Sequence, residues 1–420
     1  MLEIFVIGYC IYFLVNIYTS FMQIGYIKSA KELQPIILEE DKYKVAGNYA
    51  IEKEKLAIFS TFYDFIIFMA WISFGLSALD SVVATESSIL KAVIFINLFI
   101  AINWILTLPF SIYQTFKLDK KYGFSNMTAS LYVKDTIKSS ALFLIFGSIV
   151  IAVVAFIVAN FSNWWIWGFV FIFAVIILIN MLYPVIRDKM FDKFEKLKDS
   201  ELEAKIEKLL EEVGFKSSGI FSVDASKRDN RLNAYFGGLG STKRVVLFDT
   251  LVQKLTHNEL LAVLGHELGH FKNGDILKNI GIMGVVMFVF FAIFGNLPDE
   301  IFLGAGINNE AYGIIAIFLL FSPILSYFLM PIISLISRHN EYAADEFGSN
   351  LQSKEDLVNA LLKLANENKS FPLSHPLYIF FYYSHPPLVE RFKELDYNVY
   401  NHGDEALKAK DIERELKHGV

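Results

Sequence analysis

Seven long apolar stretches constrain this chain of 420 residues more than any other feature of its sequence. Each is long enough to cross the roughly 30 Å hydrocarbon core of a bilayer, which takes about 20 helical residues. A hydrophobic fraction of 54% and a charged fraction of 20% agree with this and exclude a disordered chain. The sequence therefore predicts a multi-pass integral membrane protein with spans near residues 4–23, 57–79, 90–113, 141–160, 164–184, 276–296 and 314–336.

The loops between these stretches differ in charge from one face to the other. The first, third and fifth loops are rich in Lys and Arg, whereas residues 80–89, 161–163 and 297–313 contain neither. Loops that carry an excess of Lys and Arg remain in the cytoplasm. We therefore expect the N-terminus outside and both large polar regions, residues 185–275 and 337–420, in the cytoplasm.

These boundaries divide the chain into four parts. Residues 1–184 form a five-span membrane region, and residues 276–336 contain spans six and seven. Residues 185–275 predict a helix over 199–213 and short strands near 219–224, 232–237 and 244–248, followed by another helix. Residues 337–420 predict helices broken by Pro372, Pro376 and the Pro386-Pro387 pair. Because the two polar regions face one compartment, they can share one site.

The net charge and the cysteine content exclude one class of partner and one kind of cross-link. The net charge of −6 argues against a nucleic acid partner, because phosphate binding needs a clustered positive surface. The single cysteine, Cys10, lies in the first apolar stretch, so the chain can form no internal disulfide.

A five-residue motif in the first polar region predicts metal binding and catalysis. Residues 266–270 read His-Glu-Leu-Gly-His, and on a helix His266 and His270 share one face and can bind one metal ion. Glu267 lies beside them and suits the general base of a zinc hydrolase, acting on a water that the zinc polarises. Thr256 and Glu259 have the spacing of a capping box, which predicts that a helix begins just before the motif.

A catalytic zinc normally takes three protein ligands and one water, so a third ligand is needed. Residues 337–345, directly after the seventh apolar stretch, contain two acids at helical spacing, Glu341 and Asp345. Glu341 suits the third ligand, and Asp345 suits an acceptor for the outer N–H of a ligating histidine. His339 is a competing candidate that would make a site of three histidines.

With these motifs, the chain resembles the Ste24-type CAAX prenyl proteases of the M48 group of zinc metalloproteases. Residues 121–128, Lys-Tyr-Gly-Phe-Ser-Asn-Met-Thr, are similar to a segment of the N-terminal half of that family. Residues 385–391, His-Pro-Pro-Leu-Val-Glu-Arg, are similar to its C-terminal motif. The resemblance covers nearly the whole chain and implies a predominantly α fold: seven transmembrane helices and a cytoplasmic zinc metalloprotease domain with a small β-sheet.

The resemblance also implies roles for individual residues. It assigns His266, His270 and Glu341 as ligands of one Zn²⁺ per chain, Glu267 as catalytic base and Asp345 as a partner of a ligand, and thereby favours Glu341 over His339. It places His385, as a catalytic donor, and Arg391 near the substrate and the developing oxyanion. The substrate-binding strand of the family resembles residues 232–237, where Asn233, Ala234 and Tyr235 would contact an extended peptide. His375, which lacks the second proline and the arginine of the His385 motif, is interpreted as structural.

The predicted function is a zinc-dependent membrane endopeptidase whose substrates are peptides or proteins at the bilayer. For eukaryotic members the resemblance implies substrates with a C-terminal prenylated cysteine. Two alternatives stay open at this point: a quality-control protease for misfolded membrane proteins, and a membrane scaffold with a structural zinc. A structural zinc usually has four protein ligands, often cysteines, which disfavours the scaffold. We expect a bacterial cell membrane rather than the endoplasmic reticulum, with the active site on the cytoplasmic side.

Overall fold

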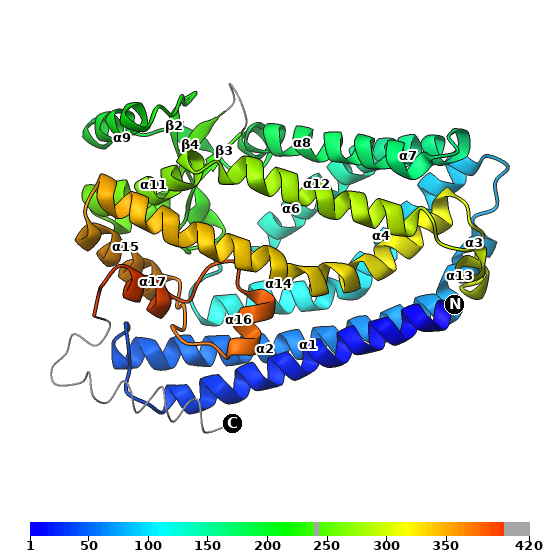
Figure 1. The fold of residues 1–420 in the computed structure, drawn as a ribbon, viewed down its shortest axis with the longest axis horizontal. Helices are drawn as coiled ribbons and strands as arrows, with labels where there is room; N and C mark the ends of the chain where they lie inside the picture. The colour runs from blue at the N-terminus through cyan, green and yellow to red at the C-terminus, as the bar shows by residue number, and fades with distance from the viewer. Residues whose placement is uncertain (239–242, 399–420) are drawn as a thin grey trace.

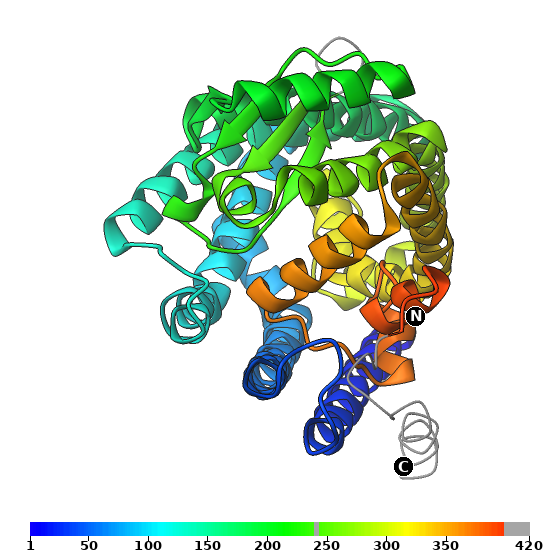
Figure 2. The ribbon, with the colours of Figure 1, turned by 90° about the vertical axis from the view of Figure 1, so that its left-hand side faces the viewer.

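The computed structural model describes residues 1–238 and 243–398. Within them, seven helical segments are long and apolar enough to cross a membrane, which confirms the predicted number of spans. They run side by side, and Figure 2 shows them arranged in a ring when viewed along their length. The segments are α1 (Leu2–Lys31), α2 to α3 (Glu40–Val82), α4 to α5 (Ser88–Lys121), α6 to α7 (Ala129–Asn160), α8 (Trp164–Met190), α12 (Asp275–Phe294) and α14 (Ala311–Leu351).

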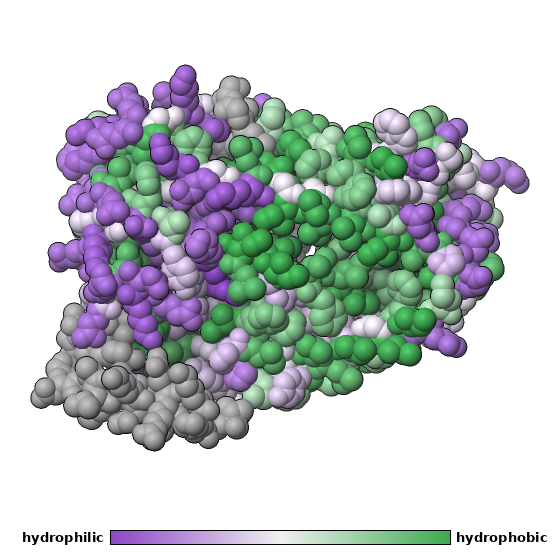
Figure 3. Space-filling model, viewed as in Figure 1, coloured by the Kyte–Doolittle hydropathy of each residue, from purple (hydrophilic) through white to green (hydrophobic). Residues whose placement is uncertain are grey.

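The surface of this bundle matches a bilayer. Figure 3 shows a broad apolar band over the middle of the helices, with hydrophilic side chains gathered at both ends. Many large apolar side chains in the band are exposed, among them Ile66, Phe74, Phe146 and Leu277. Exposed apolar surface of this extent is unfavourable in water but is solvated by lipid.

Several helices are longer than the apolar stretches that predict them. Helix α14 has 41 residues, a length of about 60 Å, which is twice the thickness of the hydrocarbon core. The prediction ended this span at residue 336, but no glycine or proline interrupts the chain before Gly348, and the helix continues to Leu351. Glu341 and Asp345 therefore lie on a rigid continuation of a membrane helix rather than on a separate one.

A four-stranded sheet lies at the end of the bundle where α14 leaves the membrane (Figure 1). Its strands are β1 (Phe194–Lys196), β2 (Ile220–Val223), β3 (Ala234–Gly237) and β4 (Arg244–Phe248), in the order β1-β2-β4-β3. Strands β2 and β4 are parallel, and the other two pairs are antiparallel. The prediction missed β1 because three residues show no alternating pattern, and it began β3 two residues early. Strand β3 occupies an edge of the sheet.

Two amphipathic helices pack together with this sheet around a common core. They are α9 (Ser200–Val213), where the Asp199 side chain caps the first turn, and α11 (His257–Lys272). The core between them includes Leu202, Ile206, Val245, Leu247 and Leu264, all nearly inaccessible to solvent. Burial of these side chains fixes the position of α11, which carries His266 and His270.

The C-terminal region returns to the same end of the molecule as short helices. They are α15 (Lys354–Glu367), α16 (Pro376–Tyr382) and α17 (Leu388–Glu394). Residues 399–420 of the predicted C-terminal region lie outside the described residues. Helices α10 (Asp249–Lys254) and α13 (Asp299–Gly304) complete the connections.

Candidate metal centre and active site

Helix α11 begins with the capping box that its sequence predicted. Thr256 Oγ1 accepts a hydrogen bond from the backbone N–H of Glu259, and Glu259 Oε2 accepts one from the N–H of Thr256 at 2.7 Å. Lys363 Nζ of α15 also donates to Glu259, at 2.7 Å. These bonds fix where the helix begins, and His266 and His270 follow with the spacing that places both on one face.

Helices α11 and α14 cross at nearly backbone contact, because glycines line the crossing. A Cβ atom added to Gly348 would lie 2.7 Å from the backbone nitrogen of His266, and one added to Gly269 would lie 2.9 Å from Cα of Ala344. Gly265 lies in the same crossing, with the corresponding contact to Cα of Gly348 at 3.3 Å. The close approach brings a short acidic side chain of α14 within reach of both imidazoles of α11.

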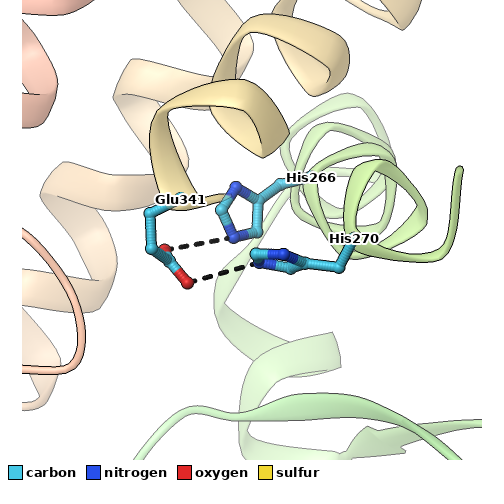
Figure 4. A group of neighbouring side chains, drawn as sticks. All are labelled: His266, His270 and Glu341. Atoms are coloured by element: carbon cyan, nitrogen blue, oxygen red, sulfur yellow. Dashed lines mark ion pairs between the residues drawn. The ribbon is translucent and has the colours of Figure 1, made fainter. Parts of the chain in front are cut away.

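His266, His270 and Glu341 meet at this crossing and form a group that could hold a metal ion (Figure 4). One potential ligand atom from each lies within 4.8 Å of the other two. Nε2 of His266 is 3.5 Å from Glu341 Oε2, and Nε2 of His270 is 3.3 Å from Glu341 Oε1. Two imidazoles and one carboxylate are the donor set of many catalytic zinc sites.

The electrostatics of the cluster favour a cation. Oε2 of Glu341 is buried and has no hydrogen-bond partner among the described residues, which is costly unless a cation compensates it. Burial alone would lower the pKa of His270, but hydrogen bonds to Glu341 and Asp275 outweigh it and raise that pKa to about 9. The residues present thus fit a divalent metal ion.

Each histidine of the cluster has an acidic partner for its Nδ1 atom. Nδ1 of His266 is 2.8 Å from Oδ1 of Asp345, as the sequence predicted, and Nδ1 of His270 is 3.0 Å from Oδ2 of Asp275. Sequence reasoning missed Asp275, the first residue of α12. The signal was present, since a His ligand needs an outer acceptor and Asp275 follows His270 by five residues. These carboxylates orient the two rings so that both Nε2 atoms point toward Glu341.

Arg391 of α17 lies beneath the cluster and is buried. It donates from Nε and Nη2 to the two oxygens of Asp345 at 2.7 and 2.6 Å, and its Nη1 lies 3.8 Å from Glu341 Oε2. Burial opposes the charge, but the bonds to Asp345 dominate and raise the pKa of the guanidinium. A fixed positive charge therefore lies behind the cluster, with Nη1 as its one donor not engaged by Asp345.

A cavity of about 150 Å³ beside the cluster gathers most of the other predicted residues. Its lining includes Glu267, Asn233, Ala234, His385 and Arg391, together with His266 and Glu341. Tyr235 does not line it. It lines a second cavity, between α8 and α12, together with Phe236 and Gly237.

The two remaining histidines near the cluster differ in position. Nε2 of His385 lies 3.2 Å from Glu341 Oε1, although His385 follows in a distant part of the sequence. His339, the competing ligand, is exposed on α14 and lies outside the three-residue cluster. Among the described residues, the structure therefore assembles the set with Glu341 rather than the set of three histidines.

Comparison with known proteins identifies the family of the chain. A model of peptidase family M48 matches residues 196–399, and a model described as "CAAX prenyl protease N-terminal, five membrane helices" matches residues 23–193. CAAX prenyl protease 1 of Saccharomyces cerevisiae is 33% identical over 406 residues, which cover 88% of this chain and 89% of the relative. The chain belongs to the Ste24-type CAAX prenyl protease family.

Two further relatives support the same conclusion. A homologue of CAAX prenyl protease 1 from Dictyostelium discoideum is 35% identical over 326 residues, 74% of this chain and 75% of the relative. The crystal structure of S. mikatae Ste24p has a TM-score of 0.85 and 31% identity, and covers 94% of this chain and 98% of that chain. The predicted fold class and enzyme class are thereby confirmed: this Ste24-family member is a multi-pass membrane zinc endopeptidase.

Proposed function

We propose that this protein cleaves peptide bonds near the C-terminus of prenylated, CAAX-type proteins at the membrane surface. The observation that carries the proposal is the convergence of His266, His270 and Glu341 beside a cavity that Glu267 also lines. The substrate class rests on the relatives, which are named CAAX prenyl proteases and match the chain over most of its length.

One zinc ion per chain would be held by His266, His270 and Glu341. The donor set supports this assignment, as does the buried Oε2 of Glu341, which has no hydrogen-bond partner among the described residues. When bound, zinc polarises a water molecule and the attacked carbonyl, and it lowers the pKa of that water toward 7. Asp345 and Asp275 hold the two imidazoles in the tautomers that leave Nε2 free to bind.

The side chains that line the cavity supply the proton transfers. Glu267 accepts a proton from the attacking water as general base and then delivers it to the leaving amine. His385, close to Glu341 and partly exposed to the cavity, donates a hydrogen bond to the carbonyl oxygen as negative charge develops there. Arg391 assists Glu267 and His385, because it holds Asp345 in place and contributes a positive charge.

The substrate backbone would bind along the free edge of β3. Asn233 and Ala234 line the cavity, and Tyr235 continues the edge away from it, so an extended peptide paired with these residues passes the metal cluster. The backbone that leads into β3 is fixed by the side chain of Asn368. This side chain accepts a hydrogen bond from the N–H of Leu232 at 2.8 Å and donates one to the carbonyl of Leu232 at 3.2 Å.

A Glu267→Gln variant tests the catalytic assignment. We expect zinc content equal to that of the parent and a loss of peptide cleavage of at least 100-fold, typical of removing a general base. Glu346→Gln, an exposed acid on α14, is the matched control and should cleave at the rate of the parent. Cleavage by Glu267→Gln at the rate of the parent would overturn the proposed mechanism.

The substrate class needs its own comparison. One peptide is offered with and without a C-terminal prenyl group, beside an unfolded membrane protein. We expect kcat/KM for the prenylated peptide to exceed that for the same peptide without the lipid. Equal values, with faster cleavage of the unfolded protein, would favour a quality-control protease. Cleavage of none of them by zinc-loaded protein would favour the scaffold.

For localisation and domain organisation we propose the arrangement that the loop charges predict. The five-span region 1–184, the polar region 185–275, spans 276–336 and the region 337–420 would place the site in the cytoplasm. In a Cys10→Ala background, Lys208→Cys on α9 should be protected from an impermeant thiol reagent in intact cells, while Glu86→Cys should react. The reverse result would invert the topology. The bacterial cell membrane stays a prediction of the sequence, and a host without protein prenylation would favour the quality-control outcome of the comparison above.

A further inference from the structure

Helix α16 (Pro376–Tyr382) connects the membrane helices with the active site. It packs against α1 at one end and against α14 along its length, and Figure 1 shows it between these two helices. Three residues after it ends, the chain reaches His385, the proposed donor to the oxyanion. The position of α16 therefore affects where His385 lies.

The N-terminal end of α16 is fixed to α1 and α2 by polar side chains. Gln23 accepts a hydrogen bond from the N–H of His375 at 2.8 Å and donates to Ser374 Oγ at 3.1 Å. Tyr378 donates to Glu54 of α2 at 2.6 Å. His375 itself caps the helix, since its Nδ1 accepts from the N–H of Leu377, which agrees with its interpretation as structural.

A cation from α14 binds the backbone at the C-terminal end of α16, where Tyr327 of α14 also packs against Phe381 and Tyr382. Carbonyl groups in the last turn of a helix have few intrahelical partners. Nη1 of Arg338 donates to the carbonyl oxygen of Tyr383 at 2.6 Å and to that of Ile379 at 3.3 Å. Arginine at a helix C-terminus satisfies these carbonyls and also interacts favourably with the helix dipole.

Arg338 and the metal ligand Glu341 lie three residues apart on α14, so they share one face of a rigid helix. Glu341 is 3.2 Å from His385 Nε2, and Arg338 binds the backbone two residues before His385. The same turn of α14 thus contacts the metal cluster and the segment that carries the donor.

The side chain of His385 has little packing of its own to fix it. It is 64% exposed, and its Nδ1 contacts only the neighbouring Ser384 Oγ among the hydrogen bonds of the described residues, at 2.9 Å. An exposed side chain with so few contacts takes its position from its backbone. At Tyr383 the backbone carbonyl is bound by Arg338, while the Tyr383 hydroxyl lies 2.6 Å from Ser374 Oγ.

We propose that Arg338 is a positioning residue for catalysis: by binding the carbonyl of Tyr383, it holds the imidazole of His385 at the reacting carbonyl oxygen. The proposal rests on the role proposed above for His385. Arg338 is not part of the metal cluster, and it acts through the backbone of residues 383–385.

A double-mutant cycle tests the proposal with the purified full-length protein. The variants are Arg338→Met, which removes the donors and keeps the stem, His385→Ala, and the two combined. For Arg338→Met we expect kcat to fall about 10- to 100-fold, with KM within about twofold and zinc content unchanged, because a displaced oxyanion donor costs somewhat less than a deleted one. In the His385→Ala background, Arg338→Met should cost less than about threefold.

Two further variants separate this role from a general structural one. Arg338→Lys keeps a cation that can reach one carbonyl, and we expect it to recover part of the lost kcat. Tyr342→Phe, on the same helix, removes a 3.1 Å bond to Glu390 of α17 without touching α16, and should keep the parent rate. If Arg338→Met does not fold, Arg338→Lys takes its place in the cycle.

The outcomes distinguish this proposal from the proposed function. Additive effects of the two substitutions, a loss of zinc, or a parent-like kcat in Arg338→Met while His385→Ala is slow would overturn the role of Arg338 alone. A parent-like kcat in His385→Ala would overturn the role of His385 and this proposal together. A slow His385→Ala with strongly non-additive effects supports both.

Discussion

The crossing of α11 and α14 leads to a graded prediction about the glycines that line it. A Cβ atom at Gly348 would lie 2.7 Å from the backbone nitrogen of His266 and 2.9 Å from its Cα, whereas ordinary contacts begin at 3.4 Å. Since the obstructing atoms belong to the backbone, no side chain can rotate away. In Gly348→Ala the two helices must therefore separate by about 0.7 Å at this point.

That separation acts directly on the metal cluster. His266 and His270 lie on one helix and Glu341 on the other, and a metal site tolerates changes in ligand distance of only about 0.2 Å. We expect Gly348→Ala to weaken zinc binding by at least about tenfold, or about 1.4 kcal/mol. The free energy of unfolding should fall by about 1–3 kcal/mol from overpacking, partly offset by about 1 kcal/mol of helix propensity.

The assay is zinc content after dialysis against a zinc buffer, together with cleavage of a fluorogenic peptide and thermal unfolding. The distances order the series: Gly348→Ala should be most affected, then Gly269→Ala (2.9 Å to Cα of Ala344) and then Gly265→Ala (3.3 Å to Cα of Gly348). Gly281→Ala in α12 is the control, because nothing lies within 4 Å of its added Cβ, and it should match the parent. Parent-like zinc binding by Gly348→Ala would refute the reasoning.

Further predictions concern the residues that hold His270, the backbone before β3 and the start of α11. Asp275→Asn should weaken zinc binding about 10- to 100-fold in a chelator competition, while Lys278→Gln, which removes only a contact to Asp275, should change it less than about threefold. Asn368→Ala should raise KM more than it lowers kcat, because it frees the backbone that leads into β3; an unchanged KM would count against pairing along this edge. Burial would raise the pKa of Glu259, but Lys363 and Thr256 lower it. Its stabilising contribution is therefore complete above its unfolded pKa of about 4.3 and is lost as pH falls through its lowered folded pKa. The free energy of unfolding of Glu259→Gln should accordingly depend less on pH below about 4.3 than that of the parent.

Much of the molecule could be predicted from local patterns in the sequence. The seven spans follow from runs of apolar residues, since length and composition alone decide whether a helix can cross a bilayer. The metal motif and the capping box follow from the 3.6-residue period, which fixes the face on which His266 and His270 lie. Strand β1 was missed because its three residues are too short to show a period.

Other parts of the site depend on contacts between distant segments, which no local pattern encodes. Residues 337–345 offered both His339 and Glu341 as a third ligand, and the family resemblance favoured Glu341. Packing at the glycine crossing brings Glu341, and not His339, to the two imidazoles. In the same way, strand order makes β3 an edge, and the return of the C-terminal region puts His385 beside Glu341. The sequence by itself determined a membrane chain with a two-histidine metal motif. Only the tertiary structure placed Glu341 and Asp345 beside the two imidazoles, because close packing between helices far apart in the chain sets those distances.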